Sequence, residues 1–236
     1  MGAQWKKSAK SVASQKKGLV FTKVAREIQV AAKLGGPDIA GNHRLARAVS
    51  AAKAISCPND TIDRAIKKGS GQLGDTQIDE IMYEGFGPHQ VGLLVECQTD
   101  NRVRTASEIR LLFKSHGGNL GEMGSVAWMF DRVGFIEASP PKGMVDAETE
   151  AIEAGANDVE KSEGENYNFY GAIEDLETVR NNLTTRGWKV ITSEPSFKAK
   201  NLTEVSAAQR QEVEAFLQAV DDYDDTHKIF TSASFI

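Results

Sequence analysis

The chain has 236 residues, of which 40% are hydrophobic and 26% are charged. These fractions are ordinary for a globular protein, so they exclude a disordered or fibrous chain, and the length allows two or three domains. No run approaches the roughly 18 apolar residues of a membrane-spanning helix, and the first residues lack a secretory apolar stretch, so we expect a cytoplasmic protein that does not enter a membrane. The alternative is a processed mitochondrial form, from which a transit peptide would already have been removed.

The charge is distributed very unevenly along the chain. The formal net charge is −5, yet residues 1–74 hold 14 Lys and Arg against 4 Asp and Glu, which gives this segment +10 and the remainder −15. Such asymmetry predicts a segment that binds a polyanion. Two alternatives are a basic surface that is merely solvated and one that docks on the acidic remainder of the same chain.

Residues 1–18 are predicted to form a basic arm, because they contain too little apolar surface to pack by themselves. Trp5 within the arm could stack on a nucleic-acid base or pack on the body of the protein. The arm contributes the candidate phosphate-binding residues Lys6, Lys7, Lys10, Lys16 and Lys17.

Residues 19–74 are predicted to form a helical nucleic-acid-binding domain. Apolar residues recur at the helical period over 19–34, 42–56 and about 59–68, with Asn59 or Asp60 expected to cap the third helix and Gly69 to end it. Lys and Arg bind phosphate by releasing counterions, so the cations on these helices are further candidates. They are Lys23, Arg26, Lys33, Arg44, Arg47, Arg64, Lys67 and Lys68.

The central part of the chain changes to strands and helices. Residues 80–86 and 91–98 are predicted to form a hairpin through Gly87-Pro88-His89. A helix is expected to begin at Thr105, which has capping-box spacing to Glu108, and residues 125–130 are predicted to be a strand.

From residue 133 onward the order is strand, helix, strand, strand, helix, strand, which is the split βαβ order. We therefore expect an inserted domain over residues 133–204 and a discontinuous α+β domain over 75–132 plus 205–236, the latter completed by a helix at 206–220 and the segment around Ile229-Phe230. The predicted fold class is α+β, with a small all-helical N-terminal domain and two α+β (ferredoxin-like) domains, the last inserted into the second.

The sequence contains no pattern that strongly indicates catalysis or a bound metal. Cys57 and Cys97 lack CxxC spacing, and the four histidines are scattered, so no metal or cofactor is expected. Glu84 and Glu96 could act as paired carboxylates, but exposed glutamates on a sheet are commoner. The amides of the glycine-rich run 117–125 could hold an anion, and tight turns explain the run at least as well. Residues 221–225 contain four aspartates, and a solvated helix end is favoured over a metal site.

A set of stretches over residues 2–134 can be compared with known families: Phe21-Thr22-Lys23, Arg26-Glu27-Ile28, 31–38, 64–69, 83–88, 99–102, 104–105, 117–121 and 124–131. In these stretches the chain resembles the YebC family of predicted transcriptional regulators, and the similarity covers most of residues 2–134. Gly2-Ala3-Gln4-Trp5 departs from the family, which has His-Ser-Lys before the tryptophan, and residues 135–225 match weakly.

The resemblance implies three domains and a non-enzymatic role in binding nucleic acid. Bacterial members are described as DNA-binding transcriptional regulators, mitochondrial relatives are translational activators of cytochrome c oxidase, and some bacterial members act at the ribosome. The expected partner is DNA. The alternative is ribosomal or messenger RNA or the ribosome, and the acidic domains could recruit a protein partner.

Overall fold

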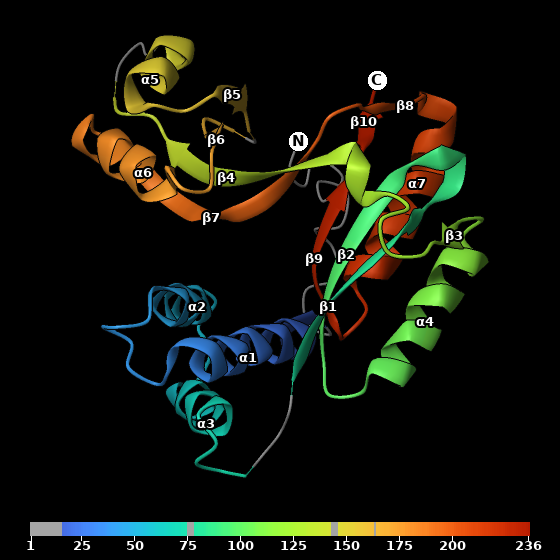
Figure 1. The fold of residues 1–236 in the computed structure, drawn as a ribbon, viewed down its shortest axis with the longest axis horizontal. Helices are drawn as coiled ribbons and strands as arrows, with labels where there is room; N and C mark the ends of the chain where they lie inside the picture. Colours follow the sequence, from blue (N-terminus) through green and yellow to red (C-terminus); the bar gives the residue numbers. More distant parts are fainter. Residues whose placement is uncertain (1–15, 75–77, 143–145, 163) are drawn as a thin grey trace. The chain divides into compact units, whose positions relative to one another are not determined.

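The structure is a computed structural model that describes residues 16–74, 78–142, 146–162 and 164–236, with the side chains of residues 16 and 17 left out. The described residues fall into two compact units (Figure 1). One unit contains residues 128–202. The other contains the described residues before 128 together with 203–236.

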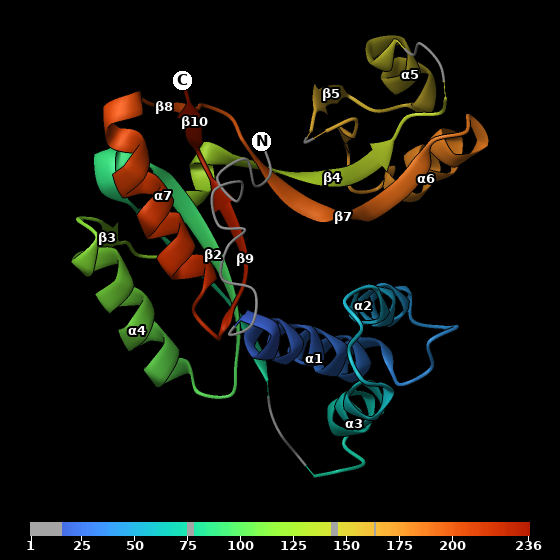
Figure 2. The same ribbon diagram turned by 180° about the vertical axis from the view of Figure 1, so that it is seen from behind.

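Three helices form the N-terminal helical region: α1 (Lys16–Gly35), α2 (His43–Ala54) and α3 (Asn59–Gly69). Helices α2 and α3 pack on opposite sides of α1 (Figures 1 and 2). Ile28, Leu45 and Ile62 are almost completely buried where the three helices meet. The helical prediction is confirmed, but α1 begins at Lys16, so the last three residues assigned to the arm are helical. Residues 1–15 lie outside the described residues.

The packing of α3 on α1 requires glycine at position 69. A Cβ atom at Gly69 would lie 2.2 Å from the backbone oxygen of Gln29, so the two backbones approach more closely than any side chain allows. Gly69 is the last residue of α3, near its predicted end. The expected cap at Asn59 or Asp60 is wrong, because the oxygen of Pro58 already accepts from the amide of Thr61 and no side chain caps the helix.

Asn42 joins the end of α1 to the start of α2. Its Oδ1 accepts from the amide of Leu45 at 3.0 Å, and its Nδ2 donates to the oxygens of Ala31 at 2.7 Å and Gly36 at 2.9 Å. One buried side chain therefore satisfies polar groups at two helix ends.

Replacement of Asn42 by alanine is expected to lower the free energy of unfolding by about 2 kcal/mol, because a helix cap and buried hydrogen bonds are lost together. Urea denaturation of the purified protein measures this change. Asn59→Ala is the matched control, since Asn59 caps nothing, and an equal loss in the two variants would contradict the prediction.

The central domain is built on a sheet of order β3-β1-β2-β9. Its strands are β1 (Asp79–Phe86), β2 (Gly92–Thr99), β3 (Asn119–Leu120) and β9 (Thr226–Thr231). β1 and β2 pair antiparallel, with Ile81 opposite Cys97, which confirms the predicted hairpin. β9 pairs with β2, so the C-terminal segment completes this sheet.

Helices α4 (Arg102–Ser115) and α7 (Ala207–Asp221) cover one face of that sheet (Figures 1 and 2). The rings of Phe113 and Phe216 meet edge to face, with centroids 5.0 Å apart. The last short strands, β8 (Thr203–Val205) and β10 (Ala233–Phe235), form a separate parallel pair that the sequence did not predict.

Two local predictions in the central domain are wrong. α4 begins at Arg102 and is capped by Asn101, whose Oδ1 accepts from the amide of Arg104 at 3.1 Å. Thr105 is buried inside the helix, where it cannot cap. The predicted strand at 125–130 is a 3₁₀ turn at Ala127–Met129, after which the next strand begins.

The inserted domain has a sheet of order β5-β6-β4-β7 and two helices on one face of it. Its elements in chain order are β4 (Phe130–Ser139), α5 (Ala147–Ala154), β5 (Asp158–Lys161), β6 (Tyr167–Gly171), α6 (Leu176–Thr185) and β7 (Lys189–Ala199). The buried rings of Phe169 and Trp188 meet edge to face in its core. This is the expected ferredoxin-like arrangement. β4 and β7, where the chain enters and leaves the domain, are neighbours along their length.

Candidate nucleic-acid interface

Four of the predicted phosphate-binding side chains lie on α2 and α3 and form no ion pair with any residue that the structure describes. Arg47, Arg64 and Lys67 are exposed, and Lys68 is half-buried. The last three lie on α3 within one turn of one another. These four side chains, here called the free cation set, are available to a ligand.

Acidic side chains also lie close to the free cation set. α3 also carries Asp60 and Asp63, both exposed. Asp60 lies four residues before Arg64 and Asp63 four before Lys67, spacings at which opposite charges attract along a helix. The local field is therefore weaker than a count of the cations suggests.

Four other predicted site residues are directed toward the central domain of the same chain. The ammonium group of Lys23 donates to the backbone oxygen of Asp221, and that of Lys33 donates to the oxygen of Ile78 at 3.1 Å. Arg26 and Arg44 make ion pairs there. These four residues follow the alternative in which the basic surface docks on the remainder of the same chain. Their charged groups already contact acceptors of the central domain.

Arg44 connects the helical region to the edge of the central sheet. Its guanidinium lies 2.8 Å from Glu27 of α1 and 2.5 Å from Glu80 of β1. Burial would raise the pKa values of both carboxyls, but hydrogen bonds and charge from Arg44 hold the pKa of Glu27 and of Glu80 below their ordinary values. Gln98 also donates to Glu27, at 2.6 Å.

Asp225 is the centre of a second contact. Its side chain is only 2% exposed, and Oδ1 lies 2.6 Å from Arg26 of α1. Oδ2 lies 2.9 Å from Arg104 and accepts from the hydroxyl of Thr105 at 2.6 Å. Burial would raise the pKa of Asp225, but the hydrogen bonds of Arg104 and Thr105 and the charge of Arg26 hold it below its usual value. The expectation of a solvated helix end is therefore wrong at this residue.

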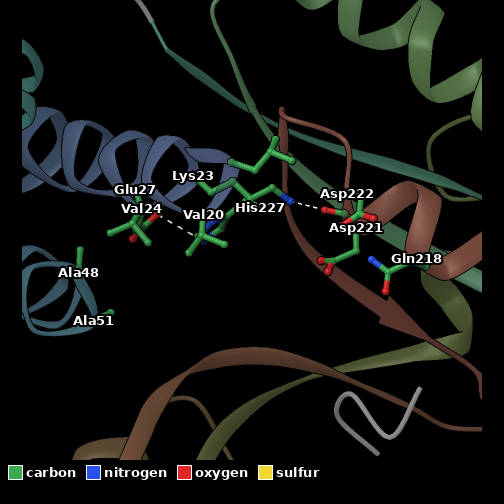
Figure 3. Close-up of a pocket in the computed structure, with 11 residues that line it drawn as sticks. Val20, Lys23, Val24, Glu27, Ala48, Ala51, Gln218, Asp221, Asp222 and His227 are labelled. Carbon is green, nitrogen blue, oxygen red and sulfur yellow. Dashed lines mark hydrogen bonds and ion pairs between the residues drawn. The ribbon is translucent and has the colours of Figure 1, made fainter. Parts of the chain in front are cut away.

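A pocket of about 430 Å³ is lined by residues of α1, α2, the end of α7 and β9 (Figure 3). Val20 and Val24 of α1 form part of its apolar wall, and Ala48 and Ala51 of α2 stand across from them. Lys23 and Glu27 of α1 also line it, and the remaining polar residues, Asp221 among them, lie at the end of α7 and on β9. The helical region is thus held to the central domain mainly by polar contacts around an incompletely filled space.

The low pKa values of Glu27, Glu80 and Asp225 predict that this attachment is sensitive to acid. Their folded-state pKa values lie below the unfolded values of about 4, so their stabilising contribution is complete above about pH 5 and is lost as the pH falls through the folded values. We expect the protection factors of the amides in α1 and α2, corrected for the intrinsic exchange rate at each pH, to fall on acidification below about pH 4, before the core of the inserted domain opens. Simultaneous loss of protection in both would contradict this expectation.

The remaining predicted site residues belong to the start of the chain. Lys6, Lys7 and Lys10, with Trp5, lie outside the described residues. Lys16 and Lys17 begin α1. Their contribution to binding stays a prediction.

Glu84 has a structural contact with the glycine-rich run. Its carboxylate, only 6% exposed, accepts from the amides of Gly124 at 3.0 Å, Val126 at 3.0 Å and Ala127 at 2.8 Å. The run does hold an anion, but the anion is a side chain of the same chain. Glu84 lies opposite Leu94 on β2 and Glu96 lies opposite Met82 on β1, so the two glutamates do not face each other across the strands.

Within the described residues, no group of three or more His, Cys, Asp or Glu side chains is arranged to hold a metal ion. None of the described helices combines the length and the apolar character needed to cross a membrane.

Sequence reasoning missed Glu80 and Asp225 as partners of the basic helices. The only signal for Asp225 was its place in an aspartate-rich run, and Glu80 is one of several acidic residues on a strand. Neither pattern identifies a cation elsewhere in the chain.

Comparison with known proteins gives matches along nearly the whole chain. Residues 1–72 match the model of the TACO1/YebC protein N-terminal domain, and residues 78–233 match that of the TACO1/YebC second and third domain. A probable transcriptional regulatory protein of Bdellovibrio bacteriovorus is 59% identical over 97% of this chain and 98% of its own length. One of a Polaromonas species is 46% identical over 98% of each chain.

A solved structure shares the fold. The crystal structure of a conserved hypothetical protein from Aquifex aeolicus superposes with a TM-score of 0.83 at 38% sequence identity, covering 94% of this chain and 92% of that one.

Proposed function

The chain belongs to the TACO1/YebC family, and from this premise we propose that it is a non-enzymatic regulator that binds double-stranded DNA through the free cation set and the basic N-terminal residues. The relatives named above are probable transcriptional regulatory proteins, which supports a regulatory role. The observation that carries the proposal is that Arg47, Arg64, Lys67 and Lys68 on α2 and α3 form no ion pair with the described residues.

The absence of catalysis is part of this proposal and is supported by the use of Glu84. This buried carboxylate accepts three backbone hydrogen bonds, and its pKa is lowered despite burial, which would raise it. A general acid at neutral pH needs a raised pKa. Glu84 is therefore suited to fixing the glycine-rich run.

Phosphate binding by the free cation set predicts a defined dependence on salt. Each phosphate contact contributes about −0.9 to the slope of log affinity against log salt for duplex DNA, so four contacts give a slope of about −3.6. Fluorescence anisotropy with a labelled duplex at several salt concentrations measures it. A slope near zero with retained binding would show that these cations do not grip phosphate.

The same cations would also fit RNA phosphates, so the alternative is a ribosome- or RNA-binding translation factor. Sequencing DNA and RNA crosslinked to the protein in the same cells separates the two. Enrichment at discrete promoter sites supports transcriptional regulation, whereas dominant ribosomal RNA crosslinks would replace it with a role in translation.

A further inference from the structure

The turn between α7 and β9 presents several oxygen acceptors to the cations of α1, as the phosphates of a nucleic acid would. Lys23 donates to the backbone oxygen of Asp221, and Arg26 donates to the backbone oxygen of Asp224 at 2.6 Å while pairing with the carboxylate of Asp225. Two cations of one helix, three residues apart, are thus held by oxygens of one turn. Cations at this spacing could otherwise reach phosphates.

A cation of α2 is held by the central domain in the same way. Arg44 meets Glu80 of the central sheet, and the side chains of both residues are 30% exposed. A partly exposed ion pair forms and breaks at low cost. By contrast, the apolar part of the boundary contains the open pocket beside Val20 and Val24.

We propose that the 221–225 turn and Glu80 act as an intramolecular competitor that masks Lys23, Arg26 and Arg44 from nucleic acid. Release of the helical region from the central domain frees Lys23 and Arg26, and it leaves Arg44 with Glu27 of α1 as its remaining partner. The regulator then has a weak masked form and a tighter open form. This inference rests on the proposed function, because it concerns the same basic surface.

The competitor can be weakened from the central domain, which leaves every cation of the helical region in place. Glu80→Gln removes the partner of Arg44 on β1. Asp225→Asn removes the charge that holds Arg26 and keeps an amide oxygen that can accept from Thr105. The matched control is Glu122→Gln combined with Glu204→Gln, because it removes two exposed acidic charges that have no ion pair with the described part of the helical region.

The test measures the binding of a labelled 20-base-pair duplex and of an RNA hairpin to the full chain, together with hydrogen exchange of α1 and α2. We expect Glu80→Gln to bind about 3-fold more tightly and the combination with Asp225→Asn about 10-fold more tightly near 0.1 M salt, since each released phosphate-binding cation contributes up to about 8-fold there. Exchange should be faster in α1 and α2, and the control should match the unmodified protein in both measurements.

The outcomes separate the two proposals. If the unmodified protein binds, and the variants show faster exchange in α1 and α2 without binding more tightly, the proposed competition is wrong and the proposed function stands. If exchange does not change in Glu80→Gln or in the combination, these ion pairs do not hold the helical region, and the inference is also wrong. If no form of the protein binds either probe, the proposed function fails together with the inference. Thermal unfolding of each variant confirms that it is folded before binding is interpreted.

Discussion

Charge reversal of Lys67 and Lys68 to glutamate is expected to weaken duplex binding by about 10- to 100-fold near 0.1 M salt. Each lost phosphate contact removes a factor of up to about 8 at this salt concentration, and the new carboxylates repel phosphate in addition. Both side chains lie in the last turn of α3 and have no ion-pair partner in the part of the chain that the structure describes. The fold should therefore be retained.

The matched control for this prediction is Lys142→Glu with Lys161→Glu, which makes the same change of charge at exposed positions of the inserted domain. Anisotropy titrations of the two double variants against one duplex give the comparison. Equal weakening by both would mean that net charge alone determines affinity, and unchanged affinity of the α3 variant would eliminate the proposed surface.

Replacement of Asp225 by alanine is expected to lower the free energy of unfolding by about 3 kcal/mol. The change removes the shared acceptor of two guanidiniums, those of Arg26 and Arg104, and leaves the buried hydroxyl of Thr105 without its shortest hydrogen bond. Part of the cost is relieved because Arg104 is nearly half exposed and water can solvate it.

Asp224→Ala tests whether the loss of stability comes from the contacts of Asp225 or from the removal of any aspartate in this turn. Its side chain is exposed, and only its backbone oxygen contacts Arg26, so the loss should stay within about 0.5 kcal/mol. Chemical denaturation of both variants measures the difference. Similar stabilities for the two would show that the Asp225 network contributes little.

The helices and strands that were predicted correctly are those whose signals lie within a short stretch of sequence. The apolar period that buries Ile28 and Leu45 identified α1 and α2, and the glycine and proline between β1 and β2 identified the hairpin. The predicted start of a helix was wrong where two nearby residues could each have served as its cap. Asn101 rather than Thr105 caps α4, because the helix begins earlier and Thr105 is needed inside to bond Asp225.

The partners of the basic side chains could not be predicted, because they depend on contacts between distant parts of the chain. Arg26 and Asp224 are 198 positions apart, and Arg44 and Glu80 are 36 apart. Nothing in the local sequence pattern distinguishes Arg26 on α1, which is paired, from Arg64 on α3, which has no ion pair within the described residues. Lysine and arginine stripes look alike whether they meet a carboxylate or a phosphate.

The pairing of β4 with β7 brings together the two points at which the chain enters and leaves the inserted domain. Phe130 lies opposite Ala199, and the amide of Lys200 donates to the oxygen of Met129 at 2.8 Å, so the chain leaves the domain beside the point where it entered. The strands of the insertion themselves bring these ends together, and the central domain does not bear the loop-closure entropy of the long excursion. The segment contributes no strand to the sheet of the central domain, so its removal would leave the strand order of that sheet the same.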